Sequence, residues 1–168
     1  MLLRDLRRQC AARIRALGLP EAFDLDLLRT ELARRRGRPI ELIPVSTGLG
    51  PRGLWVETDT ADYIAYERET SPVHQRHIIA HELAHIACGH RSGLRREDLA
   101  RLLLPSLGAE TVRGVLGRSI FSADEEREAE LFASLVLERA PTTEPLSVSE
   151  AAVARFEAFL CGQASPDP

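Results

Sequence analysis

All five histidines of this 168-residue chain lie between His74 and His90. Two of them belong to the pattern His81-Glu82-Leu83-Ala84-His85, which is an HExxH motif. Positions i and i+4 lie about 40° apart around an α-helix, so both imidazoles project from one helix face and can bind one Zn²⁺. Glu82 is then placed to act on a metal-bound water. The motif therefore predicts that this segment is a helix with a metal site on one face.

The residues around the motif favour such a helix. Ser71 is a good N-cap, and Pro72 suits the first helical position. We expect the helix that begins there to contain all five histidines or to run up to the last of them. A buried site also needs apolar residues behind it, and the segment supplies them: Ile78, Ile79, Leu83, Ile86 and Ala87.

A catalytic zinc site has three protein ligands and one position for water, so a third ligand is required. The longer pattern HExxHxxGxxH needs glycine at position 88 and histidine at position 91, where this chain has Cys88 and Arg91. That class of site is therefore excluded. We expect the other three histidines (His74, His77 and His90) to pack or hydrogen-bond around the site rather than bind the metal.

An acidic segment offers the missing ligand. Residues 124–133 carry five acids near a predicted helix start, where the helix dipole favours negative charge. Glu126, Ala129, Glu130 and Ala133 share one face of this helix, and the small residues there allow another helix to approach closely. A carboxylate on such a face needs a partner such as a metal or a ligand histidine. An acid from this segment would complete a His₂Glu site.

The rest of the chain predicts an α+β fold. Residues 1–38 have the leucine spacing of two helices, of which the second is capped by Asp24 and ended by Gly37. Residues 39–67 contain three runs rich in β-branched and aromatic residues, namely IELIPV, GLWVET and DYIAYE. These runs predict a small antiparallel three-stranded sheet, with a hairpin between the last two.

Two Ser-x-x-Glu capping boxes, beginning at Ser122 and Ser147, mark the starts of two later helices. We expect one domain over residues 1–162, followed by a flexible tail at 163–168. Its parts are a basic helical pair (1–38), a catalytic core (39–140), a linker (141–145) and a C-terminal helix (146–162).

Composition and charge exclude further classes of protein. The net charge of −3 argues against a dedicated nucleic-acid binder, although residues 1–38 hold ten arginines against five acids. Arginines interrupt the apolar residues near the N-terminus, so neither a signal peptide nor a membrane span is predicted and we expect a cytoplasmic protein. Cys10, Cys88 and Cys161 are widely spaced and form no CxxC pair, so disulfides and a cysteine zinc knuckle are not predicted.

HELAH, followed later in the chain by EREAELFASLVL, resembles the ImmA/IrrE family of small metallo-endopeptidases. The resemblance covers roughly residues 40–140. It implies that His81 and His85 bind Zn²⁺, that Glu82 is the catalytic base and that Glu126 is the third ligand. Glu130 falls where the family usually has Asn or Asp, so it would support a ligand through a hydrogen bond.

The chain also departs from the family pattern. Both Glu128 and Glu130 remain alternative ligands, and the family's usual Met-Pro after this helix is replaced by residues 137–141, LERAP. The chain therefore resembles a divergent member. The resemblance implies a minimal zincin-like domain, in which the small sheet packs on a mainly helical body that carries the HExxH active helix.

The implied reaction is zinc-dependent hydrolysis of a peptide bond in a protein partner. Members of the family typically act on a helix-turn-helix repressor in toxin-antitoxin or stress-response modules, so such a transcription regulator is the implied partner. The strand at residues 63–66 could pair with an extended substrate, with Tyr63 or Tyr66 at the oxyanion; ordinary sheet packing is the plainer interpretation of both tyrosines.

A second hypothesis belongs to another class. The chain could be a catalytically silent regulatory protein-binding module in which the zinc site is structural or vestigial. Its basic segment 1–38 would then be the interaction surface, in contact with a regulator or with DNA.

Overall fold

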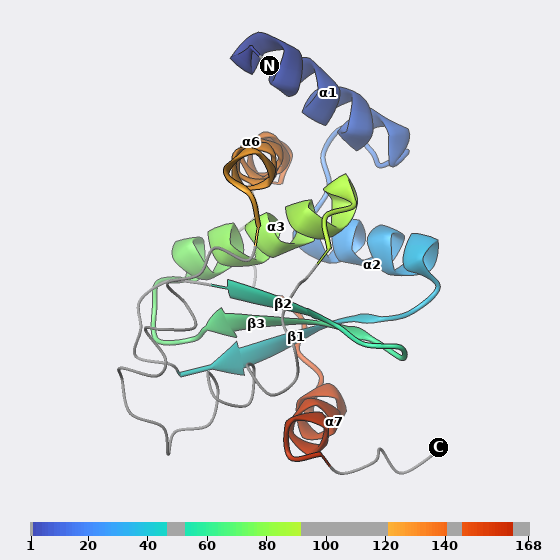
Figure 1. Cartoon of the computed structure of the whole chain (residues 1–168), viewed down its shortest axis with the longest axis vertical. Coiled ribbons are helices and arrows are strands. Elements are labelled where there is room, and N and C mark those ends of the chain that lie inside the picture. The colour runs from blue at the N-terminus through green and yellow to red at the C-terminus, as the bar shows by residue number, and fades with distance from the viewer. Residues whose placement is uncertain (1, 47–52, 92–120, 141–145, 163–168) are drawn as a thin grey trace.

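The computed structural model describes residues 2–46, 53–91, 121–140 and 146–162. Within them it forms a small, mainly helical α+β fold, as the sequence predicts (Figure 1). The predicted linker at 141–145 and tail at 163–168 lie outside the described residues. The elements are α1 (Leu3–Ala16), α2 (Leu25–Arg36), β1 (Ile40–Val45), β2 (Gly53–Glu57), β3 (Asp62–Glu67), α3 (Pro72–Cys88), α6 (Ala123–Arg139) and α7 (Glu150–Leu160).

Most helix ends lie where the sequence predicts them. Asp24 and Ser71 each accept a hydrogen bond from the backbone N–H three residues later, at the starts of α2 and α3. Ser122 and Glu125 form both bonds of a capping box at the start of α6. Gly37 ends α2 with a φ of +71°, a conformation that glycine adopts without steric cost.

The predicted capping box at Ser147 is wrong. Ser149 caps α7 instead, and its side chain accepts a hydrogen bond from the N–H of Ala152 at 3.2 Å. The hydroxyl of Ser147 bonds to Asp26 and Arg29 of α2. This serine therefore ties the segment before α7 to another helix, and the cap falls to the next serine along the chain.

The sheet has the order β1-β3-β2 and is mixed, not antiparallel throughout as predicted. β2 and β3 form the predicted antiparallel hairpin, whereas β1 runs parallel to β3. Every residue of β3 is buried, and the central position gives its backbone partners on both sides. β1 lies beside β3 rather than β2 and runs in the same direction as β3, which makes the sheet mixed.

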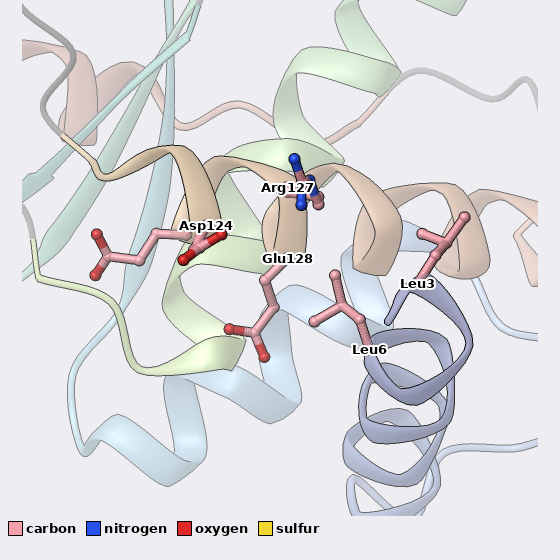
Figure 2. Close-up of a pocket in the computed structure, with 6 residues that line it drawn as sticks. Leu3, Leu6, Asp124, Arg127 and Glu128 are labelled. Atoms are coloured by element: carbon pink, nitrogen blue, oxygen red, sulfur yellow. The ribbon is translucent and has the colours of Figure 1, made fainter. Parts of the chain in front are cut away.

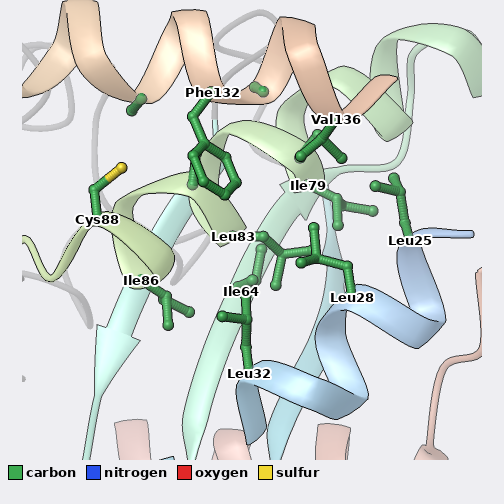
Figure 3. Close-up of a cluster of buried hydrophobic side chains, with 14 of the residues drawn as sticks. Leu25, Leu28, Leu32, Ile64, Ile79, Leu83, Ile86, Cys88, Phe132 and Val136 are labelled. Carbon is green, nitrogen blue, oxygen red and sulfur yellow. The ribbon is translucent and has the colours of Figure 1, made fainter. Parts of the chain in front are cut away.

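Helices cover both faces of the sheet (Figure 1). α2 and α3 pack on one face and α7 packs on the other, while α6 lies across α3 on the side away from the sheet. The main core lies between α2, α3, α6 and one face of the sheet (Figure 3). Ile64 and Tyr66 of β3 point into this core, whereas Tyr63 and Ala65 pack towards Phe156 of α7. The helix that carries the HExxH motif is thus held between the sheet and α6.

The two N-terminal helices pack on different parts of the molecule. α1 packs on α6, whereas α2 packs on α3 and β1. Many of their arginines form ion pairs within the chain, including those of Arg34 and Arg35 with Glu31. Among the described residues, no helix is both long and apolar enough to cross a membrane.

Candidate metal centre

Two helices bring three ligand-type side chains together. His81 and His85 lie one turn apart on α3, and Glu126 lies near the start of α6. Nε2 of His81 lies 3.1 Å from Nε2 of His85. Oε2 of Glu126 lies 3.2 Å from the first of these nitrogens and 3.9 Å from the second. The three residues predicted as metal ligands therefore converge.

These separations fit one tetrahedral ion. Bonds of about 2.0–2.1 Å from Zn²⁺ to nitrogen or oxygen set neighbouring ligand atoms about 3.3 Å apart in a tetrahedron. The observed separations of 3.1, 3.2 and 3.9 Å lie around that value. Two imidazoles and a carboxylate are also donors that divalent transition metals accept. The group could therefore hold a metal ion.

The close approach of α6 to α3 depends on small side chains. Ala129 and Ala133 are fully buried between the helices. The capping box at Ser122 fixes where α6 begins, and so fixes which of its turns faces the motif. The predicted small-residue face of this helix is confirmed, and it brings Glu126 to the histidines.

Glu130 contacts a ligand histidine on its outer side. Its Oε2 lies 3.3 Å from Nδ1 of His81 and 3.4 Å from Nε2 of His77. If a metal binds Nε2 of His81, the ring proton lies on Nδ1, the nitrogen beside this carboxylate. Glu130 thus lies where it can orient His81, which is the first of the two roles predicted for it.

His85 is held on three sides by protein. Its ring stacks on Phe121, with ring centroids 3.7 Å apart, and its Nδ1 lies 2.9 Å from Nδ1 of His90. Burial, together with the neighbouring His81 and His90, lowers the pKa of His85 to about 3. The imidazole is therefore uncharged at neutral pH, which is the form that binds a metal.

Glu128, the alternative third ligand, faces away from this cluster. Its Oε2 lies 3.2 Å from Nε2 of His90, and its Oε1 lies 3.4 Å from Nε of Arg13 in α1. Of these two carboxylates, Glu126 is therefore the one that lies beside both histidines of the motif. Cys88, His90 and Glu128 form a second group whose ligand-type atoms lie within 4.8 Å of one another.

Glu82 is packed against the sheet, and only 5% of it is exposed. Burial and the nearby carboxylate of Glu126 raise the pKa of Glu82 to about 8, against a hydrogen bond from the backbone N–H of Trp55. β2 passes so close that a Cβ at Gly53 would lie 2.8 Å from both Cγ and Oε1 of Glu82. A carboxyl group with a pKa near neutrality can both accept and donate a proton, which suits general acid–base chemistry.

The two tyrosines of β3 lie on opposite faces of the sheet. Tyr63 packs on Phe156 of α7, with ring centroids 4.9 Å apart, and so lies away from α3. Tyr66 lies on the α3 side within the main core, where burial raises the pKa of its hydroxyl. The structure therefore does not bring Tyr63 to the metal centre.

The prediction that this strand binds an extended substrate is wrong. β3 is the central strand and pairs with β1 and β2 along its length, so its backbone groups already have partners. In the sheet that the described residues form, β1 and β2 are the two edge strands.

Two residues that touch the site were not predicted from the sequence. Phe121 comes immediately before the N-cap of α6, where its burial could have been predicted, but nothing in the sequence shows that it covers His85. Gly53 lies at the start of β2, and its contact with Glu82 depends on how the sheet packs on α3. The cysteines are free, as predicted, with Cys10 and Cys88 buried and Cys161 exposed.

A pocket of about 360 Å³ lies between the starts of α1 and α6 (Figure 2). Leu3 and Leu6 form its apolar side, and the acidic first turns of α6 form the other. Glu128 is the one member of the second ligand-type group that lines it, and none of His81, Glu82 or His85 does. The pocket is therefore next to the metal centre but separate from it.

No known family model matches the chain, and no curated protein matches it. Membership of the ImmA/IrrE family therefore stays a prediction from the motifs. What the chain does has to be inferred from the geometry and chemistry of the site.

Proposed function

We propose that the protein is a zinc-dependent metallo-endopeptidase that hydrolyses a peptide bond in a protein partner. The observation that carries this proposal is the convergence of His81, His85 and Glu126, with a buried Glu82 on the same turn of α3. Three protein ligands of the His₂Glu type are characteristic of catalytic rather than structural zinc sites, which usually have four.

His81, His85 and Glu126 would hold the ion. When bound, zinc lowers the pKa of a coordinated water towards 7 and polarises a carbonyl group. Glu130 would keep His81 in the correct orientation through the contact at its Nδ1.

Glu82 would move the proton. Its carboxylate would accept a proton from the attacking water and pass it to the leaving amine, so that one group acts first as base and then as acid. The hydrogen bond from the backbone N–H of Trp55 would hold the side chain in place during both transfers. Its burial would keep bulk water from competing for the proton.

As the substrate we propose a helix-turn-helix transcriptional repressor, in a toxin-antitoxin or stress-response module. This partner comes from the resemblance of HELAH and EREAELFASLVL to the ImmA/IrrE family. A protein partner is favoured over nucleic acid because arginines of α2 pair with acids of the chain itself, as Arg29 does with Asp26 and Arg36 with Asp62. Cleavage of the repressor would relieve repression, and we expect this to happen in the cytoplasm.

The test is zinc analysis of the purified protein, followed by incubation with a candidate repressor from a neighbouring gene. Wild type should contain zinc and cleave the repressor, whereas Glu82→Gln should keep the zinc and lose cleavage. A wild type that binds the repressor and cleaves nothing, together with a Glu82→Gln variant that keeps the biological output, would favour the silent binding module instead.

The third ligand has its own control. Glu126→Ala should remove the zinc, whereas Glu128→Ala should still bind one zinc per chain at saturating zinc, because only Glu126 lies beside both histidines of the motif. Loss of zinc from Glu128→Ala alone would show that the third ligand is wrongly assigned.

A further inference from the structure

The end of α3 folds back onto the metal centre. Gly89 has a φ of +76°, and its N–H donates to the carbonyl oxygen of Ile86 at 3.1 Å. The N–H of His90 donates to the carbonyl oxygen of His85 at 3.0 Å. These two bonds form a Schellman motif, in which a left-handed glycine reverses the chain at the end of a helix. The reversal brings the imidazole of His90 against that of His85.

A line of polar contacts continues from there through the protein. Nδ1 of His85 lies 2.9 Å from Nδ1 of His90, which is itself buried. Nε2 of His90 lies 3.2 Å from Oε2 of Glu128. Oε1 of Glu128 lies 3.4 Å from Nε of Arg13. Side chains from α1 and α6 and from the end of α3 are thus connected to one residue of the candidate metal site.

A metal bound by His85 would determine where the ring protons of this line lie. Nε2 of His85 faces His81 and Glu126, so a metal there needs its lone pair and the ring proton lies on Nδ1. Nδ1 of His90 must then accept that proton, and the proton of His90 lies on Nε2, where it is donated to Glu128. Arg13 contacts the other oxygen of this carboxylate, with its Nε 3.4 Å from Oε1. Every donor in the line therefore meets an acceptor.

The contact between His85 and His90 also bears on whether the Cys88, His90 and Glu128 group binds a metal ion or only supports His85. Nε2 is the ring nitrogen of His90 that lies beside Glu128, so a metal shared with Glu128 would take its lone pair and leave a proton on Nδ1. Two protonated Nδ1 atoms would then face each other at the 2.9 Å contact with His85. The two groups thus cannot hold metal ions together while this contact persists.

We propose that His90 and Glu128 are positioning residues that hold His85 in the tautomer and orientation needed to bind a metal. The Cys88, His90 and Glu128 group then holds no metal ion of its own. This inference rests on the proposed metal site, because it concerns how firmly His85 serves as a ligand.

The test measures zinc affinity and zinc content in the full chain, and both readouts are independent of peptidase activity. Zinc affinity is measured by competition with a chromophoric chelator, and zinc per chain by elemental analysis. His90→Leu removes the acceptor and fills its space, whereas His90→Asn keeps an acceptor close to the position of Nδ1. His74→Leu is the matched control, since it removes a histidine from the first turn of the same helix. Thermal unfolding of the metal-free variants shows whether each one folds.

We expect His90→Leu to bind zinc about 10–100-fold more weakly than wild type, at one zinc per chain. His90→Asn should recover most of this loss, and His74→Leu should match wild type. Glu128→Gln should weaken zinc binding less than His90→Leu does, because an amide oxygen can still accept from His90.

Three outcomes would overturn the proposal. In the first, His90→Leu binds zinc as tightly as wild type. In the second, His90→Asn is no better than His90→Leu, so that the loss is only structural. In the third, wild type binds two zinc ions and His90→Leu binds one. A wild type that binds no zinc at all would instead overturn the proposed function, and this inference would fall with it.

Discussion

Two buried carboxylates accept hydrogen bonds from Trp55, and their other neighbours differ in charge. Asp62 of β3 accepts hydrogen bonds from the side chains of Arg36 and Arg38 and from the indole N–H of Trp55. Glu82 of α3 receives a hydrogen bond from the backbone N–H of the same tryptophan. In the part of the chain that the structure describes, no arginine forms an ion pair with Glu82.

The pKa values of the two groups differ accordingly. Burial alone would raise the pKa of Asp62, but the hydrogen bonds from Arg36, Arg38 and Trp55 outweigh burial, so its pKa lies below the ordinary value. Burial and the nearby carboxylate of Glu126 raise the pKa of Glu82 to about 8, and no arginine of the described residues pairs with it. A buried carboxylate that is paired with arginines stays ionised, and we expect it to stabilise the fold. A buried carboxyl without such a partner stays free to exchange a proton.

The largest expected difference between the two sites is in catalysis. Glu82→Gln should lower the cleavage rate of the partner by about 10²–10⁴-fold, because the amide cannot take the proton from water. Asp62→Asn should leave the rate per folded molecule nearly unchanged. Asp62 lies at one end of the β2–β3 hairpin, whereas Gly53, which lies against Glu82, is at the other end. Rates are compared at a temperature at which both variants are folded. Equal losses of cleavage rate in the two variants would show that Glu82 has no catalytic role that Asp62 lacks.

For stability we expect the opposite: Asp62→Asn should lose more free energy of unfolding than Glu82→Gln. Asp62→Asn should lower the free energy of unfolding by about 2–4 kcal/mol, because it leaves the guanidinium groups of Arg36 and Arg38 without their buried partner. Urea unfolding of the metal-free protein measures this loss. Glu57→Gln is the matched control: Glu57 contacts the same two arginines but is about one-third exposed, so its loss should stay below about 1 kcal/mol.

The stability of Glu82→Gln is measured by the same urea unfolding. Its free energy of unfolding without metal should equal or exceed that of wild type, because the substitution removes a buried carboxyl that pairs with no arginine of the described residues. A marked loss of stability would show that Glu82 has a structural role like that of Asp62.

The sequence predicted the parts of the site that depend on local signals. Ser71 and the capping box at Ser122 fixed the starts of α3 and α6 because an N-cap needs only residues within one turn. Small residues on one face of α6 then correctly predicted its packing on α3, and with it the place of Glu126. The ligand atoms could be predicted because helix periodicity determines which residues share a face.

The parts that could not be predicted depend on contacts between distant segments. β3 is buried on both faces, so its sequence shows no alternation that would tell Tyr63 from Tyr66. The parallel pairing of β1 depends on which edge of the hairpin it joins, and no short motif records that choice. His90 was expected to support the site, but its partner could not be named without the turn at Gly89 and the approach of Glu128 from α6.

Gly53 shows how the sheet controls Glu82. A Cβ at this position would lie 2.6 Å from Cγ2 of Ile78 and 2.8 Å from Cγ and Oε1 of Glu82, so one of the neighbours must move. Gly53→Ala should therefore lower the free energy of unfolding by about 1–3 kcal/mol and also reduce the cleavage rate. In the Glu82→Ala background the stability loss should be smaller, because part of the crowding is removed. Equal losses in both backgrounds would show that Ile78 alone causes the strain.

The smallest expected effect is in the acid dependence of stability. Because the folded-state pKa of Asp62 is lowered, its contribution is complete well above its ordinary pKa of 3.8 and is lost as pH falls through the lower, folded-state value. The difference in unfolding free energy between wild type and Asp62→Asn should thus be constant from pH 7 to pH 5 and narrow below about pH 4. Only part of the difference disappears by pH 3, since Asp62 is not yet fully protonated there. Urea unfolding at each pH measures it, with Glu57→Gln as the control. A gap that stays constant down to pH 3 would mean that the substitution acts through packing rather than through the charge of Asp62.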